Sequence, residues 1–149
     1  MRLLIQKCSQ ASVESEGKIR GEIGKGLMVL LGIHNSDTEK EIDYLVEKLI
    51  NLRLFEDKEN KEKYFEKSII EEGLEILLIS QFTLYASCKK GRRPDFVEAA
   101  KSEKAKPLYE KFIEKLKEKK VKVESGVFGA EMKVNLINEG PVTIIIDSQ

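Results

Sequence analysis

The first third of the chain carries the alternating and continuous apolar patterns of β-strands. Residues 3–13 contain several β-branched positions, residues 14–17 interrupt them, and residues 18–23 alternate polar and apolar side chains. This pattern predicts a hairpin with a glycine-containing turn. After a second turn at residues 24–26, the unbroken apolar run at residues 27–33 predicts a strand buried on both faces. Three successive strands therefore begin a sheet.

A first helix is predicted shortly after residue 36. Two capping boxes could start it, Ser36 with Glu39 or Thr38 with Glu41, because either pair can satisfy the free amides of a helix start. The apolar positions that follow recur at helical spacing and predict one stripe that covers a sheet: Ile42, Leu45, Val46, Leu49 and Leu52.

Two further helices are expected after residue 93. Pro94 fits the first turn of a short helix. The inward-facing side chains of that helix would be Phe96, Val97 and Ala100. Another helix starts near Ser102 with Pro107 close to its beginning, because proline is poorly tolerated in a helix interior. Leu108, Phe112 and Leu116 repeat at four-residue steps along it, and lysines crowd its last turns, where they complement the helix dipole.

The remaining apolar runs predict strands. Residues 76–79 are four consecutive large aliphatics, typical of a buried central strand, and they follow a charged connection at residues 56–72 in which we expect one short strand or turn. Three more strands are expected at residues 121–126, 133–137 and 144–146. Pro141 lacks an amide donor and belongs at a strand start or edge. The order β-β-β-α-β-α-β-β-β predicts one α+β domain over residues 1–149, with helices packed against a largely antiparallel or mixed, barrel-like sheet.

Composition indicates a globular protein with one core. The 149 residues include 26 basic and 26 acidic side chains, and 41% are hydrophobic, which suffices for one domain without disulfides or metal. No apolar run approaches the ~20 residues of a membrane span, and the N-terminal residues become polar too soon for a signal peptide. We therefore expect a cytoplasmic protein with no membrane partner.

The two cysteines and the single histidine offer little for metal or nucleophilic chemistry. Cys8 fits a small apolar filler. Cys88 lies near basic residues that would favour a reactive thiol, but no histidine is near it in sequence to act as its base. His34 ends the apolar run at residues 27–33 and is expected in a loop or cap. One histidine and two separated cysteines do not make a zinc site, so neither a metal nor a cofactor is expected.

Candidate chemistry gathers after the central strand. That strand ends in the hexapeptide SQFTLY at residues 80–85, so its hydroxyl and amide groups leave the core at a fixed place. Lys89, Lys90, Arg92 and Arg93 follow, which puts four positive charges within five positions. In a chain of balanced charge, this cluster indicates one phosphate-facing patch. The alternative is an ordinary solvated loop.

The hexapeptides SQFTLY at residues 80–85 and NEGPVT at residues 138–143 together resemble the paired signature of D-aminoacyl-tRNA deacylases. Further matches follow in the family's order over nearly the whole chain: residues 26–32, LRLF at 52–55, KGRRP at 90–94, LY at 108–109 and FGAEM at 128–132. The resemblance implies a homodimeric hydrolase that cleaves the ester between a D-amino acid and the 3′-terminal adenosine of tRNA. Glycyl-tRNA is an expected secondary substrate, because glycine has no side chain to exclude.

The resemblance also implies a role for each motif. The catalytic edge would consist of Ser80, Gln81, Phe82 and Thr83. Backbone amides near Gln81 and Phe82 would hold the ester carbonyl while the 2′-hydroxyl of the terminal ribose assists the reaction. Gly140 and Pro141, joined by a cis peptide bond, would enter the partner subunit's pocket and exclude L side chains by clash.

The remaining implied roles concern the nucleic acid. The pocket would consist of Phe128, Ala130, Met132, Asn138 and Thr143. Phe128 and Met132 would receive the terminal adenine, and the alternative for both is a plain core position. The four basic residues Lys89, Lys90, Arg92 and Arg93 would hold acceptor-end phosphates without reading sequence. The partners are thus a charged tRNA and a second copy of the chain.

Other functions remain open from the residues alone. Thr83 or Cys88 could be the nucleophile of a different hydrolase, although the sequence shows no base near Thr83. The basic segment could instead belong to an RNA-binding module without enzymatic activity. The chain departs from the family pattern at Lys7, where arginine is usual and would brace the Gly-Pro loop through its planar fork. Residues 61–72 also lack the usual asparagine-containing motif.

Overall fold

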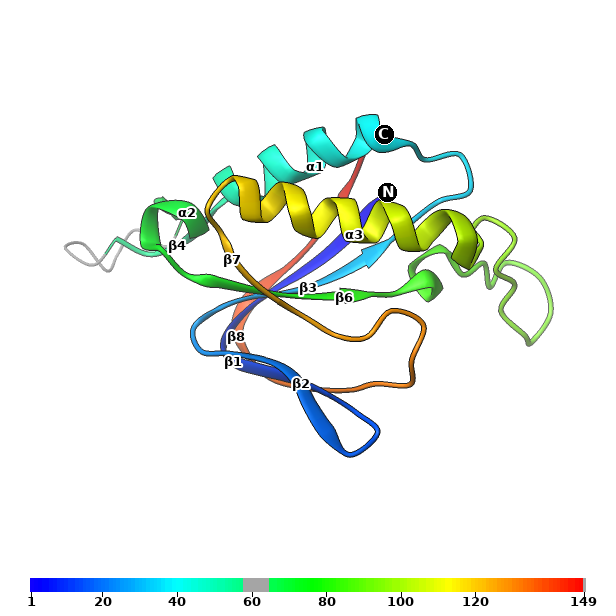
Figure 1. Ribbon diagram of the computed structural model, residues 1–149, viewed down its shortest axis with the longest axis horizontal. Coiled ribbons are helices and arrows are strands. Elements are labelled where there is room, and N and C mark those ends of the chain that lie inside the picture. Colours follow the sequence, from blue (N-terminus) through cyan, green and yellow to red (C-terminus); the bar gives the residue numbers. More distant parts are fainter. Residues whose placement is uncertain (58–64, 149) are drawn as a thin grey trace.

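Six strands form one curved sheet around which the molecule is built (Figure 1). The computed structural model describes residues 1–57 and 65–148. The strands are β1 (Arg2–Ser15), β2 (Lys18–Ile23), β3 (Gly26–Gly32), β6 (Glu75–Ser80), β7 (Lys122–Ser125) and β8 (Lys133–Asp147). Their order is β2-β1-β3-β6-β7, and β8 also pairs with β1. The β3–β6 and β6–β7 pairs are parallel and the other pairs are antiparallel, so the predicted mixed sheet is confirmed.

The N-terminal hairpin and the buried third strand form as predicted. Glu16 and Gly17 join β1 to β2 with positive φ angles of 52° and 72°, the backbone that a tight hairpin turn requires. Along β3, Leu27, Val29 and Leu31 belong to the main core under the helices. Met28 points to the opposite face and packs with a smaller cluster that includes Cys8. Both faces of β3 are therefore buried.

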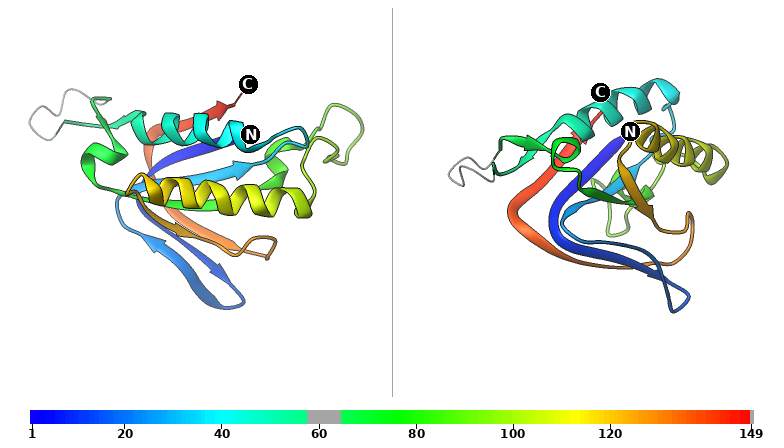
Figure 2. Two further views of the ribbon diagram at one scale, coloured as in Figure 1. Left: turned by 45° about the horizontal axis from the view of Figure 1, so that its top comes forward. Right: turned by 60° about the vertical axis from the view of Figure 1, so that its left-hand side comes forward.

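Two helices lie side by side on one face of the sheet, as both views in Figure 2 show. They are α1 (Glu39–Asn51) and α3 (Ser102–Glu118). Of the two capping boxes that the sequence allowed, the one between Thr38 and Glu41 forms, with the Thr38 amide donating to the Glu41 carboxylate at 2.7 Å. The right-hand view shows the sheet curling below the helices, which makes it barrel-like.

The end of α3 does more than complement its dipole. Lys115 forms an ion pair with Asp43 of α1 at 3.2 Å, and Lys119 pairs with Glu47 of the same helix. Pro107 lies inside α3, five positions after its first residue, in the first half of the helix, where the sequence predicted it. Because proline has no amide hydrogen, the carbonyl of Glu103, four residues earlier, lacks its helical donor. Glu103 is exposed, so water can hydrate this carbonyl, and the helix continues through Pro107.

The short helix expected after Pro94 does not form. Phe96 and Val97 are exposed, and the backbone bonds with distant segments instead. Ala100 donates to the Ile33 carbonyl at 2.9 Å, and Asn35 donates to the Glu98 carbonyl at 2.9 Å. These long-range bonds compete with a local helix for the same backbone groups, so the segment stays irregular.

The two C-terminal strands predicted at residues 133–137 and 144–146 are one strand. β8 follows β1 from Asp147 to Lys133, and the register shifts twice opposite residues 6–10 of β1. The residues between Asn138 and Thr143, which include Pro141, have no register partner there. Because β8 is an edge strand and its pairing is irregular at this point, a proline is tolerated within it.

The connection predicted at residues 56–72 holds more structure than expected. β4 (Arg53–Phe55) pairs with β5 (Lys67–Ser68), and α2 (Ile69–Glu72) follows directly. A capping box between Ser68 and Glu71 starts α2, a sequence signal that the charged composition obscured. Residues 58–64, and with them part of the atypical segment 61–72, lie outside the described residues. None of the helices in the described chain has the length and apolarity needed to cross a membrane.

Candidate active site

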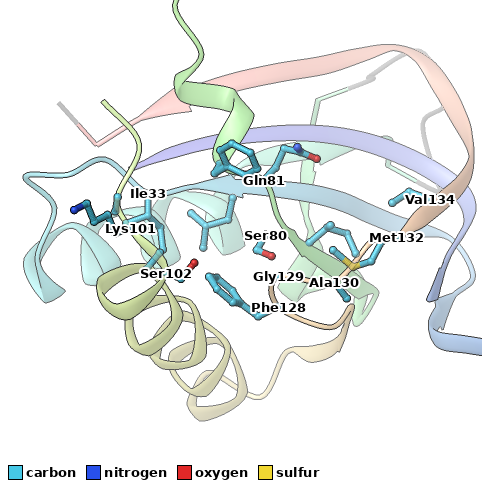
Figure 3. Close-up of a pocket in the computed structure, with 15 residues that line it drawn as sticks. Ile33, Ser80, Gln81, Lys101, Ser102, Phe128, Gly129, Ala130, Met132 and Val134 are labelled. Atoms are coloured by element: carbon cyan, nitrogen blue, oxygen red, sulfur yellow. The ribbon is translucent and has the colours of Figure 1, made fainter. Parts of the chain in front are cut away.

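A cavity of about 500 Å³ opens where β6 ends, between α3 and the connection from β7 to β8 (Figure 3). The predicted site residues that line it are Ser80, Gln81, Phe82, Phe128, Ala130 and Met132. Lining residues that the sequence interpretation missed are Leu31, Ile33, Ile79, Ala100, Lys101, Ser102, Ala105, Gly129 and Val134. The size is that of a typical small-ligand site. Leu31 could have been predicted as a lining residue from a parallel pairing of β3 with β6, because this pairing places Leu31 beside Ser80.

The hexapeptide at the end of β6 turns sharply into η1, a 3₁₀-helix (Phe82–Tyr85). The Gln81 amide donates to the Leu31 carbonyl at 2.9 Å, so this amide is occupied. The amides of Phe82 and Thr83 are the first of a helical turn that has no side-chain cap, so they have no acceptor within the helix. They are the donors that this edge can offer to a ligand.

Glycine and arginine hold η1 against the sheet. A Cβ atom on Gly32 would lie 2.9 Å from the Leu84 Cβ atom and 3.2 Å from the Gln81 carbonyl oxygen, so only glycine allows η1 to approach β3 this closely. Arg2 donates to the Leu84 carbonyl at 3.1 Å and also binds Asp147 of β8. The turn that carries the free amides is therefore fixed from two sides.

The connection from β7 to β8 supplies the opposite wall of the cavity. Phe128 packs against the ring of Tyr109 with centroids 5.6 Å apart, and the Tyr109 hydroxyl donates to the Leu78 carbonyl at 2.8 Å. Burial raises the pKa of Tyr109, so its hydroxyl remains a donor. The Met132 sulfur packs closely on Gly126, where a Cβ atom would lie only 2.4 Å from it. Figure 3 shows Phe128 and Met132 beside Ser80 around one space.

The cavity wall is mostly apolar, and its polar side chains carry two hydroxyls, an amide and one ammonium group. Among the described residues that line it, Lys101 alone is charged. Neither an imidazole, a thiol nor a carboxylate is among them. Residues 1–57 and 65–148 contain no cluster of three or more His, Cys, Asp or Glu side chains placed to hold a metal ion. The site can bind and orient a ligand and can donate hydrogen bonds to it.

Thr83 lies at the edge of this site and does not line the cavity. It is exposed, and its hydroxyl oxygen accepts a hydrogen bond from the side-chain amide of Gln81. An amide cannot remove a proton, so this contact orients the hydroxyl without activating it as a nucleophile.

The second hexapeptide is the irregularly paired middle of β8, called the Gly-Pro loop here, and it lies outside the cavity. The Gly140-Pro141 peptide bond is cis, and both residues are exposed. The Asn138 side chain donates to the Lys7 carbonyl at 2.9 Å and to the Val142 carbonyl at 3.1 Å, which ties the two ends of the loop. Thr143 accepts a bond from Gln6 at 3.2 Å. None of the loop residues lines the cavity of the same chain. Asn138 and Thr143, which were predicted in the pocket, therefore lie outside it in the single chain.

A chain of charges supports this loop from beneath. Lys7 is largely buried and binds Glu56 at 2.6 Å, and its ammonium nitrogen lies 3.8 Å from Glu139. Lys25 binds the other oxygen of Glu56 at 2.9 Å. Hydrogen bonds from Lys7 and then Lys25 lower the pKa of Glu56 to about 2. Lys7 thus braces the loop in two ways: its ammonium group lies near Glu139, and its carbonyl accepts a hydrogen bond from Asn138. An arginine at this position would offer a planar fork instead of a single charge.

The four basic residues lie apart from the cavity. Lys89, Lys90, Arg92 and Arg93 are all exposed in the segment between η1 and α3. None of them has an ion-pair partner among the described residues. Figure 1 shows this segment projecting from the end of the molecule at which α3 begins. Its charges are free to meet phosphates.

The cysteines and the histidine take structural places. Cys8 is buried, and burial raises the pKa of its thiol, as expected of an apolar filler. Cys88 is exposed and does not line the cavity. His34 follows β3, where its ring bonds with Ser36 at 2.8 Å and packs on Tyr85. The expected loop position of the histidine is confirmed.

The protein is a barrel-like α+β domain with a mostly apolar cavity at the end of its central strand, and hydrogen-bond donors border that cavity. A family model described as D-Tyr-tRNA(Tyr) deacylase matches residues 4–147. The chain belongs to this family, and the resemblance that the two hexapeptides indicated is confirmed.

The relatives and solved structures agree over the full length. The D-aminoacyl-tRNA deacylase of Brevibacillus brevis is 51% identical over 148 residues, which cover 99% of this chain and 100% of that protein. The D-aminoacyl-tRNA deacylase of Aquifex aeolicus is 53% identical over 149 residues, covering 100% and 99%. The structure titled c-Myc DNA Unwinding Element Binding Protein is 41% identical with a TM-score of 0.92 and covers 100% of this chain and 99% of its own.

A more distant structure shows the fold alone. A probable eukaryotic D-amino acid tRNA deacylase is 20% identical, with a TM-score of 0.84 and 97% of both chains covered. The expected enzyme class, hydrolases of the aminoacyl-tRNA ester, is that of the named relatives.

Proposed function

We propose that the protein hydrolyses the ester bond of D-aminoacyl-tRNA and releases the free D-amino acid and tRNA. The observation that carries this proposal is the pairing of free backbone amides with a mostly apolar cavity of about 500 Å³ at the end of β6. Membership of the deacylase family over residues 4–147 supports it.

The chemistry suits a site without an acid or a base. An aminoacyl ester is already activated, so orientation and stabilisation of the developing oxyanion supply the main acceleration. The amides of Phe82 and Thr83 would hold the carbonyl oxygen. The 2′-hydroxyl of the terminal ribose would assist the attack of water on the carbonyl carbon, and the ester bond breaks as the 3′-oxygen takes up a proton. Thr83 positions the edge through Gln81.

The cis Gly140-Pro141 loop would select for chirality across a homodimer. The loop is exposed, braced at both ends and absent from its own cavity, so it is free to enter the cavity of a partner subunit. Its carbonyls would occupy the space of an L side chain and leave a D side chain unhindered. Glycyl-tRNA, with no side chain, would also be hydrolysed.

The tRNA would bind through two surfaces. Phe128, Ala130 and Met132 line the cavity and would receive the terminal adenine. The four basic residues of the projecting segment would contact acceptor-end phosphates. No cofactor takes part in this scheme, and the protein would act on charged tRNA in the cytoplasm.

The test compares D-tyrosyl-tRNA with L-tyrosyl-tRNA, incubated with the purified protein in the presence of a chelator. We expect the D form to be hydrolysed at least about 100-fold faster than the L form, because a clash with fixed backbone excludes the latter. Buffer without protein corrects for spontaneous hydrolysis. Equal rates for both forms would refute the selection by Gly140-Pro141. Binding of tRNA without hydrolysis of either form would favour an RNA-binding module.

A further inference from the structure

Two exposed aromatic side chains pack together beside the cavity, and the proposed function assigns no role to either ring. Phe82 and Phe96 pack edge to face with centroids 5.0 Å apart. Their side chains are 56% and 38% exposed. Phe82 lines the cavity, and Phe96 packs on it from outside the lining. A contiguous exposed aromatic surface next to a binding site is typical of a place where a ligand stacks.

The fold holds this pair in place before any ligand arrives. Phe82 begins η1, which Gly32 and Arg2 fix against the sheet. Phe96 follows Asp95, whose amide and carbonyl bond with those of Ser87 at 3.0 and 2.9 Å. These two bonds close the projecting segment and bring its ends together. A ring that is already ordered loses little conformational freedom when a ligand stacks on it.

The charges nearby indicate which ligand it would be. The segment closed by Ser87 and Asp95 carries the four exposed basic residues, none of which has an ion-pair partner among the described residues. Aromatic faces combined with free cations are the chemistry that binds single-stranded nucleic acid, where bases stack and phosphates meet the charges. A second copy of this chain is neutral overall, so charge complementarity favours a polyanion as the occupant.

We propose that Phe82 and Phe96 form a stacking platform for the unpaired base that precedes the terminal adenosine of tRNA. The inference rests on the proposed function, in which the terminal adenosine occupies the cavity beside Phe128 and Met132. Phe82 belongs to both the cavity lining and the platform. The terminal adenosine in the cavity and the preceding base on the platform would therefore lie on adjoining surfaces. From there the strand would pass to the basic residues of the projecting segment. The stacking is sequence-tolerant, because every base has an aromatic face.

The test uses Phe96, which does not line the cavity, and three substrates of increasing length. These are the D-tyrosyl esters of adenosine, of the dinucleotide cytidylyl-adenosine, and of intact tRNA. Phe96→Ala should lower kcat/KM about 5- to 150-fold on the dinucleotide and on tRNA, the range expected when one base stack is removed. It should leave the adenosine ester unchanged. Phe96→Trp should retain full activity, whereas Phe96→Leu, apolar but without an aromatic face, should behave like Phe96→Ala.

Val97→Ala is the matched control, because Val97 is an adjacent apolar side chain that is 79% exposed and outside the pair. It should act on all three substrates like the wild type. Circular dichroism verifies that each variant is folded, and light scattering measures its mass in solution.

Each other outcome overturns a stated part of the scheme. If the wild type hydrolyses none of the esters, the proposed function itself fails. If the wild type is active and Phe96→Ala matches it on tRNA, or is impaired equally on the adenosine ester, the stacking platform alone is wrong. A change in mass for Phe96→Ala would show that the aromatic surface contacts a second copy of the chain, which also overturns the platform.

Discussion

Glu56 holds two lysines beneath the loop that carries Gly140 and Pro141, and its neutralisation gives a quantitative prediction. Glu56→Gln keeps the shape of the side chain but removes the charge that faces Lys7 at 2.6 Å. The Lys7 side chain is only 10% exposed, and without the Glu56 charge its ammonium group would keep the more distant ion pair with Glu139 at 3.8 Å. A buried cation without a close partner is costly.

The magnitude follows from the exposure of the pair. Breaking a fully buried ion pair costs about 3–5 kcal/mol, and an exposed pair contributes about 0–1 kcal/mol. The Glu56 side chain is 30% exposed, so solvent screening places the loss between these limits, and we expect about 1–2 kcal/mol. For a chain of this size, that corresponds to a fall in Tm of about 2–8 °C.

The pH dependence has a definite sign. The pKa of Glu56 is lowered from 4.5 to about 2, so its charge favours the folded state. This contribution is complete above pH 4.5 and is lost as the pH falls through about 2. The stability difference between wild type and Glu56→Gln should therefore be constant from pH 7 to about pH 5 and shrink below pH 4.5.

The measurement is urea unfolding followed by circular dichroism between pH 7 and pH 3, with the slope m as a check that the unfolded state is unchanged. Glu16→Gln is the control, because Glu16 is 82% exposed in its ion pair with Arg20 and should change stability by less than about 0.5 kcal/mol. The reasoning is refuted if Glu56→Gln is as stable as the wild type at pH 7, or if its deficit stays constant down to pH 3.

Three further predictions address the site. Thr83→Val should lower kcat by less than about tenfold, the effect of removing one hydrogen bond; a loss of several orders of magnitude at unchanged KM in single-turnover assays would make Thr83 the nucleophile. Replacing Arg92 and Arg93 by alanine should reduce the slope of log kcat/KM against log salt concentration by about 0.7–0.9 for each phosphate that the protein no longer neutralises; an unchanged slope would remove these residues from the tRNA interface. Tyr109→Phe removes the hydroxyl that donates to the Leu78 carbonyl at 2.8 Å and should destabilise the protein by about 1 kcal/mol in urea unfolding. Since the ring that packs on Phe128 remains, kcat should change little, and a large loss of activity would show that the hydroxyl itself takes part.

The elements that depend on local pattern could be predicted from the sequence. The β1–β2 hairpin follows from alternation and a turn that needs positive φ angles. The start of α1 follows from a capping box, and the burial of β3 follows from its unbroken apolar run. Ser80 and Gln81 could be placed at the edge of a site because a buried strand fixes where its polar end emerges.

The failures concern segments whose hydrogen-bond partners are far away in sequence. Residues 94–100 have a helical start signal, but their backbone groups bond with Ser87, Ile33 and Asn35 instead. β8 remains one strand across Pro141 because β1 supplies a partner on both sides of the irregular stretch. α2 was hidden in a charged segment, where its capping box was the informative signal.

The site divides in the same way. The sequence by itself determined the chemical inventory: the SQFTLY edge, the Gly-Pro loop, the basic segment, and Phe128 with Met132. Only the tertiary structure decided which of these share a cavity, that Leu31 and Lys101 join them, and that the Gly140-Pro141 loop lies outside. It also decided that Lys7 meets Glu56. The physical reason is that periodicity, capping and turn sterics act within a few residues, whereas a cavity is the space left where the ends of distant elements meet.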